Sequence, residues 1–113
     1  MTDALDLAAQ VRAGDVSARE LTEAAIARIE ATNPELNYLV TDCFEQALAS
    51  EPSDGPFAGV PMLVKDLNET AGVRTTFSSR AFANYVPKAD AAWNQCGSCS
   101  KYQPIQVGNG PFW

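Results

Sequence analysis

One lysine in this sequence stands directly after a continuous apolar run. Met62, Leu63 and Val64 precede Lys65, and such a run is typical of a strand that is buried on both faces. Complete burial can lower the pKa of a lysine by roughly 3–5 units, because it disfavours the charged ammonium form. A neutral amine can act as a general base, or as a nucleophile that forms a Schiff base. Lys65 is therefore the candidate catalytic residue, although spacing alone leaves open a solvated lysine that pairs with Asp66.

A second group of reactive side chains lies near the other end of the sequence. Cys96 and Cys99 are separated by two residues, a spacing found in redox sites and in half of a zinc site. The sequence has no histidine to complete a zinc site, and no second cysteine pair with this spacing. We expect two reduced thiols in an irregular tail, with no metal site.

Composition and charge exclude several classes of function. The 113 residues allow one domain with a hydrophobic core, and the net charge of −6 argues against binding to a phosphate backbone. No segment has the apolar length of a membrane span, and the first residues lack the pattern of a signal peptide. We therefore expect a cytoplasmic protein that binds neither nucleic acid nor membranes.

The elements that must position Lys65 begin with two amphipathic helices. Asp3–Ala13 has a helical apolar stripe and precedes a glycine suited to a C-terminal cap. Ser17 and Glu20 have the spacing of a capping box, which predicts a second helix over Ala18–Ala31. Asn33-Pro34 is predicted to end that helix, because the residue before a proline avoids helical geometry.

Short strands and a third helix are predicted to follow. Tyr38–Thr41 is prone to form a strand, and Asp42 can cap a helix that runs through Ala49. The apolar run 62–64 is the next predicted strand. Helices that lead into a buried strand indicate the α/β class, with residues 1–92 as one structural unit.

Residues 93–113 differ in character from the rest. All fourteen acidic residues lie between Asp3 and Asp90, and from Trp93 onward the single charged residue is Lys101. Glycines and prolines are spread through this stretch, which has neither a helical nor a strand period. We expect an irregular tail that is unrelated to the fold, arising from a truncated or frame-shifted reading frame or from a natural extension.

The segment around Lys65 resembles the lysine-bearing segment of the amidase signature family. The likeness at Phe57–Leu67 is supported upstream by Val16–Leu21 and Asn33–Asn37, and downstream by Thr70–Phe82 and Tyr85–Ala91. It extends in order over about residues 5–92. Ser78 departs from the pattern, because the family often has glycine at this position.

The resemblance implies hydrolysis of small-molecule amides by a serine–cis-serine–lysine triad without a cofactor or metal. Lys65 is the one residue that it carries over, as the base of that triad. It also implies that this chain forms the N-terminal part of a mixed sheet covered by helices. The Gly/Ser-rich stretch that holds the two catalytic serines in the family does not follow Trp93, and we expect the chain alone to be inactive or nearly so.

Two other functions are compatible with the sequence. The acidic amphipathic helices of residues 3–31 could form a non-catalytic interaction module, or a homodimer, by packing against a partner or a second copy. Lys65 could instead form a Schiff base with a carbonyl compound.

Overall fold

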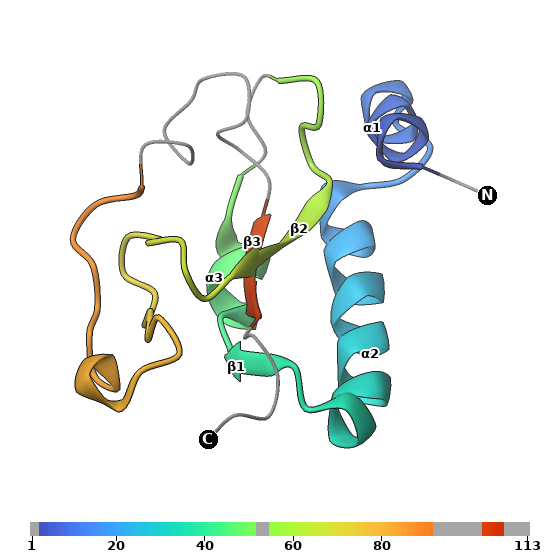
Figure 1. The fold of residues 1–113 in the computed structure, drawn as a ribbon. Helices are drawn as coiled ribbons and strands as arrows, with labels where there is room; N and C mark the ends of the chain where they lie inside the picture. The colour runs from blue at the N-terminus through green and yellow to red at the C-terminus, as the bar shows by residue number, and fades with distance from the viewer. Residues whose placement is uncertain (1–2, 52–54, 92–102, 108–113) are drawn as a thin grey trace.

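The computed structural model describes residues 3–51, 55–91 and 103–107, the last of these as backbone alone. Three helices and three strands are arranged as Figure 1 shows, with a short 3-10 helix, η1, in a loop on the side of the sheet away from α2. Their bounds are α1 (Ala4–Ala13), α2 (Ala18–Leu36), β1 (Leu39–Thr41), α3 (Phe44–Ala49), β2 (Pro61–Lys65), η1 (Arg80–Phe82) and β3 (Gln103–Val107).

The first two helices have the caps that the sequence predicts. Asp3 accepts hydrogen bonds from backbone N–H groups in the first turn of α1, and Gly14 ends that helix in the left-handed conformation with φ +79°. Ser17 and Glu20 form the predicted capping box at the start of α2, each side chain bonding to the other's backbone N–H. The helix predicted over Asp3–Ala13 is confirmed, and so is the start of the second.

The end predicted for the second helix is wrong. α2 continues through Pro34 to Leu36, and Asn37 ends it in the left-handed conformation. The missing N–H of Pro34 breaks one helical bond, but other contacts hold the last turn. The backbone N–H of Asn37 donates to the carbonyl of Asn33 at 2.7 Å, and the side chain of Asn33 accepts from the N–H of Leu39 at 2.8 Å.

The strands form one sheet in the order β1-β3-β2. β3 lies antiparallel to β1 and parallel to β2, with Gln103 opposite Pro61 and Val107 opposite Lys65. The prediction of irregular structure across the tail is therefore wrong for residues 103–107. One reason is Pro104, which cannot donate to a ladder and argues against a central strand when the sequence is read alone.

Helices α2 and α3 pack against the sheet, where α2 contacts β2 and α3 contacts β3. The described core consists of apolar side chains without aromatic rings: Ala8, Ile29, Cys43, Ala47, Val60, Val64 and Val73. Several threonines and one carboxyl group are buried beside them. Gly59, just before β2, lies so close to α2 that an added Cβ atom would stand 2.9 Å from the Cβ of Ala18. This close contact fixes where β2 begins relative to the helices.

In the part of the chain that the structure describes, no helix has the length and apolar character needed to cross a bilayer.

Candidate functional site

Lys65 is the last residue of β2, and its side chain is exposed. The expectation of a strand buried on both faces is wrong, because Val64 is 1% exposed whereas Leu63 is 48% exposed. Side chains alternate between the faces of a strand, so Leu63 and Lys65 share the open face. The described residues do not surround the Lys65 amine with the low-dielectric environment that the apolar run predicts.

Asp66 follows Lys65 and is fully buried. Its carboxylate contacts Thr76, whose backbone N–H donates to Oδ1 at 2.8 Å and whose hydroxyl donates to Oδ2. The backbone carbonyl of Asp66 also accepts from the N–H of Phe77 at 3.1 Å. The sequence suggests Asp66 as a partner of Lys65 and does not predict this role, since nothing local in the sequence pairs Asp66 with a threonine ten residues later.

Residues 66–91 form a loop segment that is held together by its own hydrogen bonds. The N–H of Thr75 donates to the carbonyl of Tyr85 at 3.0 Å, and that of Gly72 donates to the carbonyl of Pro87 at 3.0 Å. The N–H of Ala71 donates to the carboxylate of Asp90 at 2.7 Å. These bonds fold the chain after Lys65 into a defined structure.

The turn at residues 77–79 has an unusual backbone. Phe77 and Ser78 adopt φ values of +51° and +54°, in the left-handed region, where residues other than glycine are uncommon. Next to it, the hydroxyl of Ser79 accepts from the N–H of Ala81 at the start of η1. The rings of Phe77, Phe82 and Tyr85 pack on one another with centroids 5.3–6.1 Å apart.

Tyr85 links this aromatic cluster to Glu69, which lies shortly after the end of β2. Its hydroxyl donates to the carboxylate of Glu69 at 2.5 Å. The hydrogen bond to Glu69 raises the pKa of Tyr85, because the carboxylate stabilises the protonated phenol, and burial and the negative charge act in the same direction.

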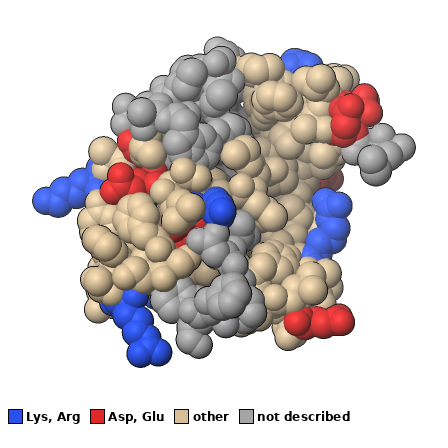
Figure 2. Space-filling view, in the orientation of Figure 1, with Lys and Arg blue, Asp and Glu red and all other residues tan. Residues whose placement is uncertain are grey.

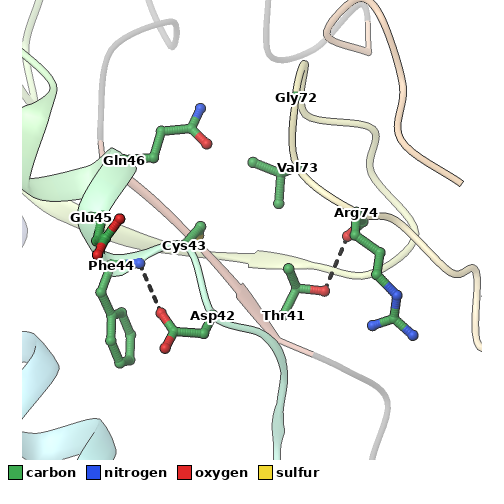
Figure 3. A pocket seen from close by; sticks show the side chains of 9 residues that line it. All are labelled: Thr41, Asp42, Cys43, Phe44, Glu45, Gln46, Gly72, Val73 and Arg74. Carbon is green, nitrogen blue, oxygen red and sulfur yellow. Dashed lines mark hydrogen bonds between the residues drawn. The ribbon is translucent and has the colours of Figure 1, made fainter. Parts of the chain in front are cut away.

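A cavity of about 540 Å³ lies between the start of α3 and residues 72–74 (Figure 3). Its walls are Thr41, Asp42, Cys43, Phe44, Glu45, Gln46, Gly72, Val73 and Arg74. The hydroxyl of Thr41 donates to the backbone carbonyl of Arg74 at 3.1 Å, and the N–H of Phe44 donates to Asp42 at 3.0 Å. Lys65 is not among the lining residues. The sequence does not predict this cavity, because its two walls come from segments that are distant in the chain.

No metal site is seen in what the structure describes. Residues 3–51 and 55–91 contain no group of three or more His, Cys, Asp and Glu side chains that could hold a metal ion. Cys96 and Cys99 lie outside the described residues. On the face shown in Figure 2, the Lys and Arg side chains stand apart from one another, so this face carries no basic patch among the described residues.

Comparison with known proteins decides the family. The model of the Amidase family matches residues 20–94, a range that contains β2 and Lys65. The chain belongs to the amidase family. Its α/β class agrees with that of solved amidase signature enzymes.

Two kinds of curated amidase-family relative are similar to this chain. A glutamyl-tRNA(Gln) amidotransferase subunit from Alkalilimnicola ehrlichii is 44% identical over 95 residues, which cover 76% of this chain and 20% of the relative. The 6-aminohexanoate-cyclic-dimer hydrolase of Paenarthrobacter ureafaciens is 52% identical over 66 residues, which cover 58% of this chain and 13% of the relative. The chain thus spans at most about a fifth of the length of these relatives.

Solved structures of the family have the same fold over most of the chain. A 6-aminohexanoate cyclic dimer hydrolase superposes with a TM-score of 0.74 at 36% identity, covering 96% of this chain and 23% of that protein. A bacterial aryl acylamidase described as an amidase signature enzyme gives a TM-score of 0.77 at 25% identity, covering 93% and 24%.

Proposed function

We propose that Lys65 is the general base of an amide-hydrolysing site, and that this chain forms the lysine-bearing part of that site. The observation that carries the proposal is the place of Lys65 at the end of β2, inside the range that matches the family model. Its side chain is exposed, so it can be reached by groups outside the described residues. The substrate class is a carboxylic amide, in keeping with the names of the hydrolase relatives.

The reaction that the resemblance implies places Lys65 at the start of a proton relay. Its neutral amine takes a proton from a bridging serine, which in turn deprotonates the nucleophilic serine. That serine attacks the amide carbonyl, and backbone N–H groups stabilise the oxyanion. The relay then gives the proton to the leaving nitrogen, the C–N bond breaks and the amine departs, and water hydrolyses the acyl-serine to release the acid. The relay uses neither a metal nor a cofactor.

The open face of β2 is where we propose that the rest of the site is built. Leu63 is half-exposed there and shares the face with Lys65. The relatives are about five times longer than the matched segment, and the segments that this chain does not match would cover that face. Covering it would exclude water from around the amine. The sheet β1-β3-β2 would then be part of a larger mixed sheet.

The first experiment is an assay of the purified chain against a panel of simple amides, in which we expect no turnover. A base without its nucleophile leaves no covalent route, and removing one member of such a unit removes most of the acceleration. Turnover by the chain alone that disappears in Lys65→Ala would contradict the expected inactivity.

The second experiment tests Lys65 in an active context. Residues 20–91 would replace the matching segment of the Paenarthrobacter 6-aminohexanoate-cyclic-dimer hydrolase, giving a chimera whose hydrolysis of that cyclic dimer is measured. We expect Lys65→Ala to lower kcat about 10³-fold or more. Lys88→Ala is the matched control, because Lys88 is also exposed but lies outside the strand. Full turnover by the Lys65→Ala chimera would refute the role proposed for this lysine.

A non-catalytic interaction module formed by α1 and α2 is the second candidate. Leu5 and Leu36, near opposite ends of this helix pair, are 56% and 62% exposed, and a second copy could cover them in a homodimer. Light scattering coupled to size-exclusion chromatography distinguishes the two states. A discrete dimer that Leu5→Ser or Leu36→Ser converts to a monomer would support the module, and a monomer at all concentrations would exclude the homodimer.

A further inference from the structure

A buried carboxyl group lies next to the exposed lysine. Asp66 is fully buried, and Val64, on the other side of Lys65, is only 1% exposed. A buried carboxyl group is costly unless hydrogen bonds compensate for the lost water. Thr76 provides two such bonds, one from its backbone N–H at 2.8 Å and one from its hydroxyl.

The contact between Asp66 and Thr76 closes the loop that follows Lys65. It is continued by the N–H of Phe77, which donates to the carbonyl of Asp66, and by that of Ser79, which donates to the carbonyl of Thr76. The left-handed conformations of Phe77 and Ser78 lie directly beyond this closure. Such conformations persist only where surrounding contacts hold them, and the bond from the N–H of Phe77 to the carbonyl of Asp66 is one of those contacts.

The same closure fixes the backbone from which the Lys65 side chain departs. Lys65 lies between two buried residues, and its carbonyl accepts from the N–H of Asn68 at 3.0 Å. A lysine side chain has a flexible four-carbon stem, so its amine reaches a defined place only if its backbone is held. The Asp66 side chain is buried, whereas the Lys65 side chain is exposed.

We propose that Asp66 is a positioning residue for Lys65 and acts through Thr76. In this proposal, which rests on the function proposed for Lys65, the carboxylate acts by holding the backbone and takes no part in the reaction itself. It anchors Asp66 to Thr76, ten residues later in the loop, and so holds the backbone of Lys65 in its place at the end of β2. Loss of the anchor leaves the amine present but misplaced.

Thr76→Val tests this proposal with little change in shape. Valine keeps the volume and the backbone N–H of Thr76 but removes the hydroxyl that donates to Asp66. Thr76→Ser keeps that hydroxyl and is the matched rescue variant. Asp66→Ala, which removes both contacts, is the more severe change and can unfold the loop.

The first measurement uses the 113-residue chain with its lysines reductively methylated with ¹³C. Lys65, Lys88 and Lys101 each give a dimethylamine signal, and the signals of Lys65 and Lys88 are assigned with Lys65→Arg and Lys88→Arg. We expect Thr76→Val to shift or broaden the Lys65 signal and to leave the Lys88 signal unchanged. In Thr76→Ser, which keeps the hydroxyl, we expect the Lys65 signal to be the same as in the unmodified chain. An unchanged Lys65 signal in Thr76→Val would overturn the proposal.

The second measurement is kinetic and separates this proposal from that for Lys65 itself. In the chimera, Thr76→Val should lower kcat about tenfold or more and change KM less than about twofold, because misplacing a catalytic group affects the reaction step. Thr76→Ser should restore kcat. Val73→Ala, at a buried residue in the same loop, is the control, because it shows how far destabilising the loop alone changes kcat and KM.

The outcomes are distinguishable. If Lys65→Ala inactivates the chimera while folded Thr76→Val keeps its kcat, positioning by Asp66 is wrong and the role of Lys65 stands. If Lys65→Ala is active, the proposed function fails. In that case a response of the Lys65 signal to Thr76→Val still reports the structural link.

Discussion

Ser78 occupies a backbone conformation that favours glycine. Its φ is +54°, and an L-residue in the left-handed region costs roughly 1–2 kcal/mol. Glycine adopts the same conformation without that cost, which accounts physically for the glycine that the amidase signature pattern often has here. The departure noted in the sequence is therefore a local loss of stability in the loop that follows Lys65.

Ser78→Gly should make the protein more stable than Ser78→Ala. Both variants remove the hydroxyl, so their difference isolates the backbone, and we expect about 1 kcal/mol in favour of glycine after the greater entropy of glycine in the unfolded chain is included. Urea denaturation followed by circular dichroism gives the two free energies of unfolding. Equal stability of the two variants would mean that the backbone at Ser78 is not strained.

Residue types near Lys65 could be predicted from the sequence, but their environments could not. The lysine, the strand before it and the family resemblance follow from one short run of consecutive residues, Phe57–Leu67. The exposure of Leu63 and the bond between Asp66 and Thr76 depend on which parts of the chain come together in space. An apolar run does not report whether both faces of a strand are covered.

At the scale of elements, helix α2 owes its start to a reciprocal cap. The backbone N–H and the hydroxyl of Ser17 both donate to the carboxylate of Glu20, at 2.8 and 2.7 Å. These hydrogen bonds lower the pKa of Glu20, because they stabilise its charged form. The stabilisation from Glu20 is thus fully present above the pKa of an unfolded glutamate, near 4.5, and is lost as the pH falls through the lower folded value.

Glu20→Gln should destabilise the protein at neutral pH and have a smaller effect in acid. Glutamine can still accept a hydrogen bond but carries no charge, so the difference from the unmodified chain shrinks as Glu20 becomes protonated. Denaturation monitored by circular dichroism across about pH 3–7 measures this difference. Glu30→Gln, also exposed on α2, is the control. If the difference in free energy of unfolding between the two proteins did not change with pH, the lowered pKa of Glu20 would be contradicted.

Local signals explain which elements could be predicted. Caps at Asp3, Gly14 and Ser17 lie within a few residues of the helices that they begin or end, so the sequence is sufficient to predict them. Pro34 misleads because the last turn of α2 is held by contacts of Asn33 that extend beyond the helix. β3 could not be predicted, because its ladder partners in β1 and β2 are distant in the chain.

At the scale of the whole molecule, one glycine sets how closely the helices approach the sheet. An added Cβ at Gly59 would lie 2.9 Å from the Cβ of Ala18 and 3.0 Å from a methyl group of Val11. The first contact involves the first atom of a short side chain, which cannot turn away. α1, α2 and the entry to β2 therefore meet at a point that admits no side chain.

Gly59→Ala should be more destabilising than Gly72→Ala. Both glycines have left-handed backbones, with φ values of +80° and +75°, but an added Cβ at Gly72 meets nothing within 4 Å. The difference isolates overpacking, which costs about 1–3 kcal/mol. Thermal and urea denaturation of the two variants provide the comparison. Equal losses would show that the helices move apart freely at Gly59.

The place of β3 between β1 and β2 has a consequence for how the protein is made. During synthesis, β1 and β2 leave the ribosome well before residues 103–107, which form β3. β3 lies between the two earlier strands and pairs with both. During that interval α1 and α2 can form, because their hydrogen bonds join residues that are close in the chain. β1 and β2, however, both lack β3 as a pairing partner. Non-local pairing of this kind is slow and leaves unpaired strand edges open to aggregation. Newly synthesised chains should accordingly be most prone to aggregate in the interval before β3 emerges.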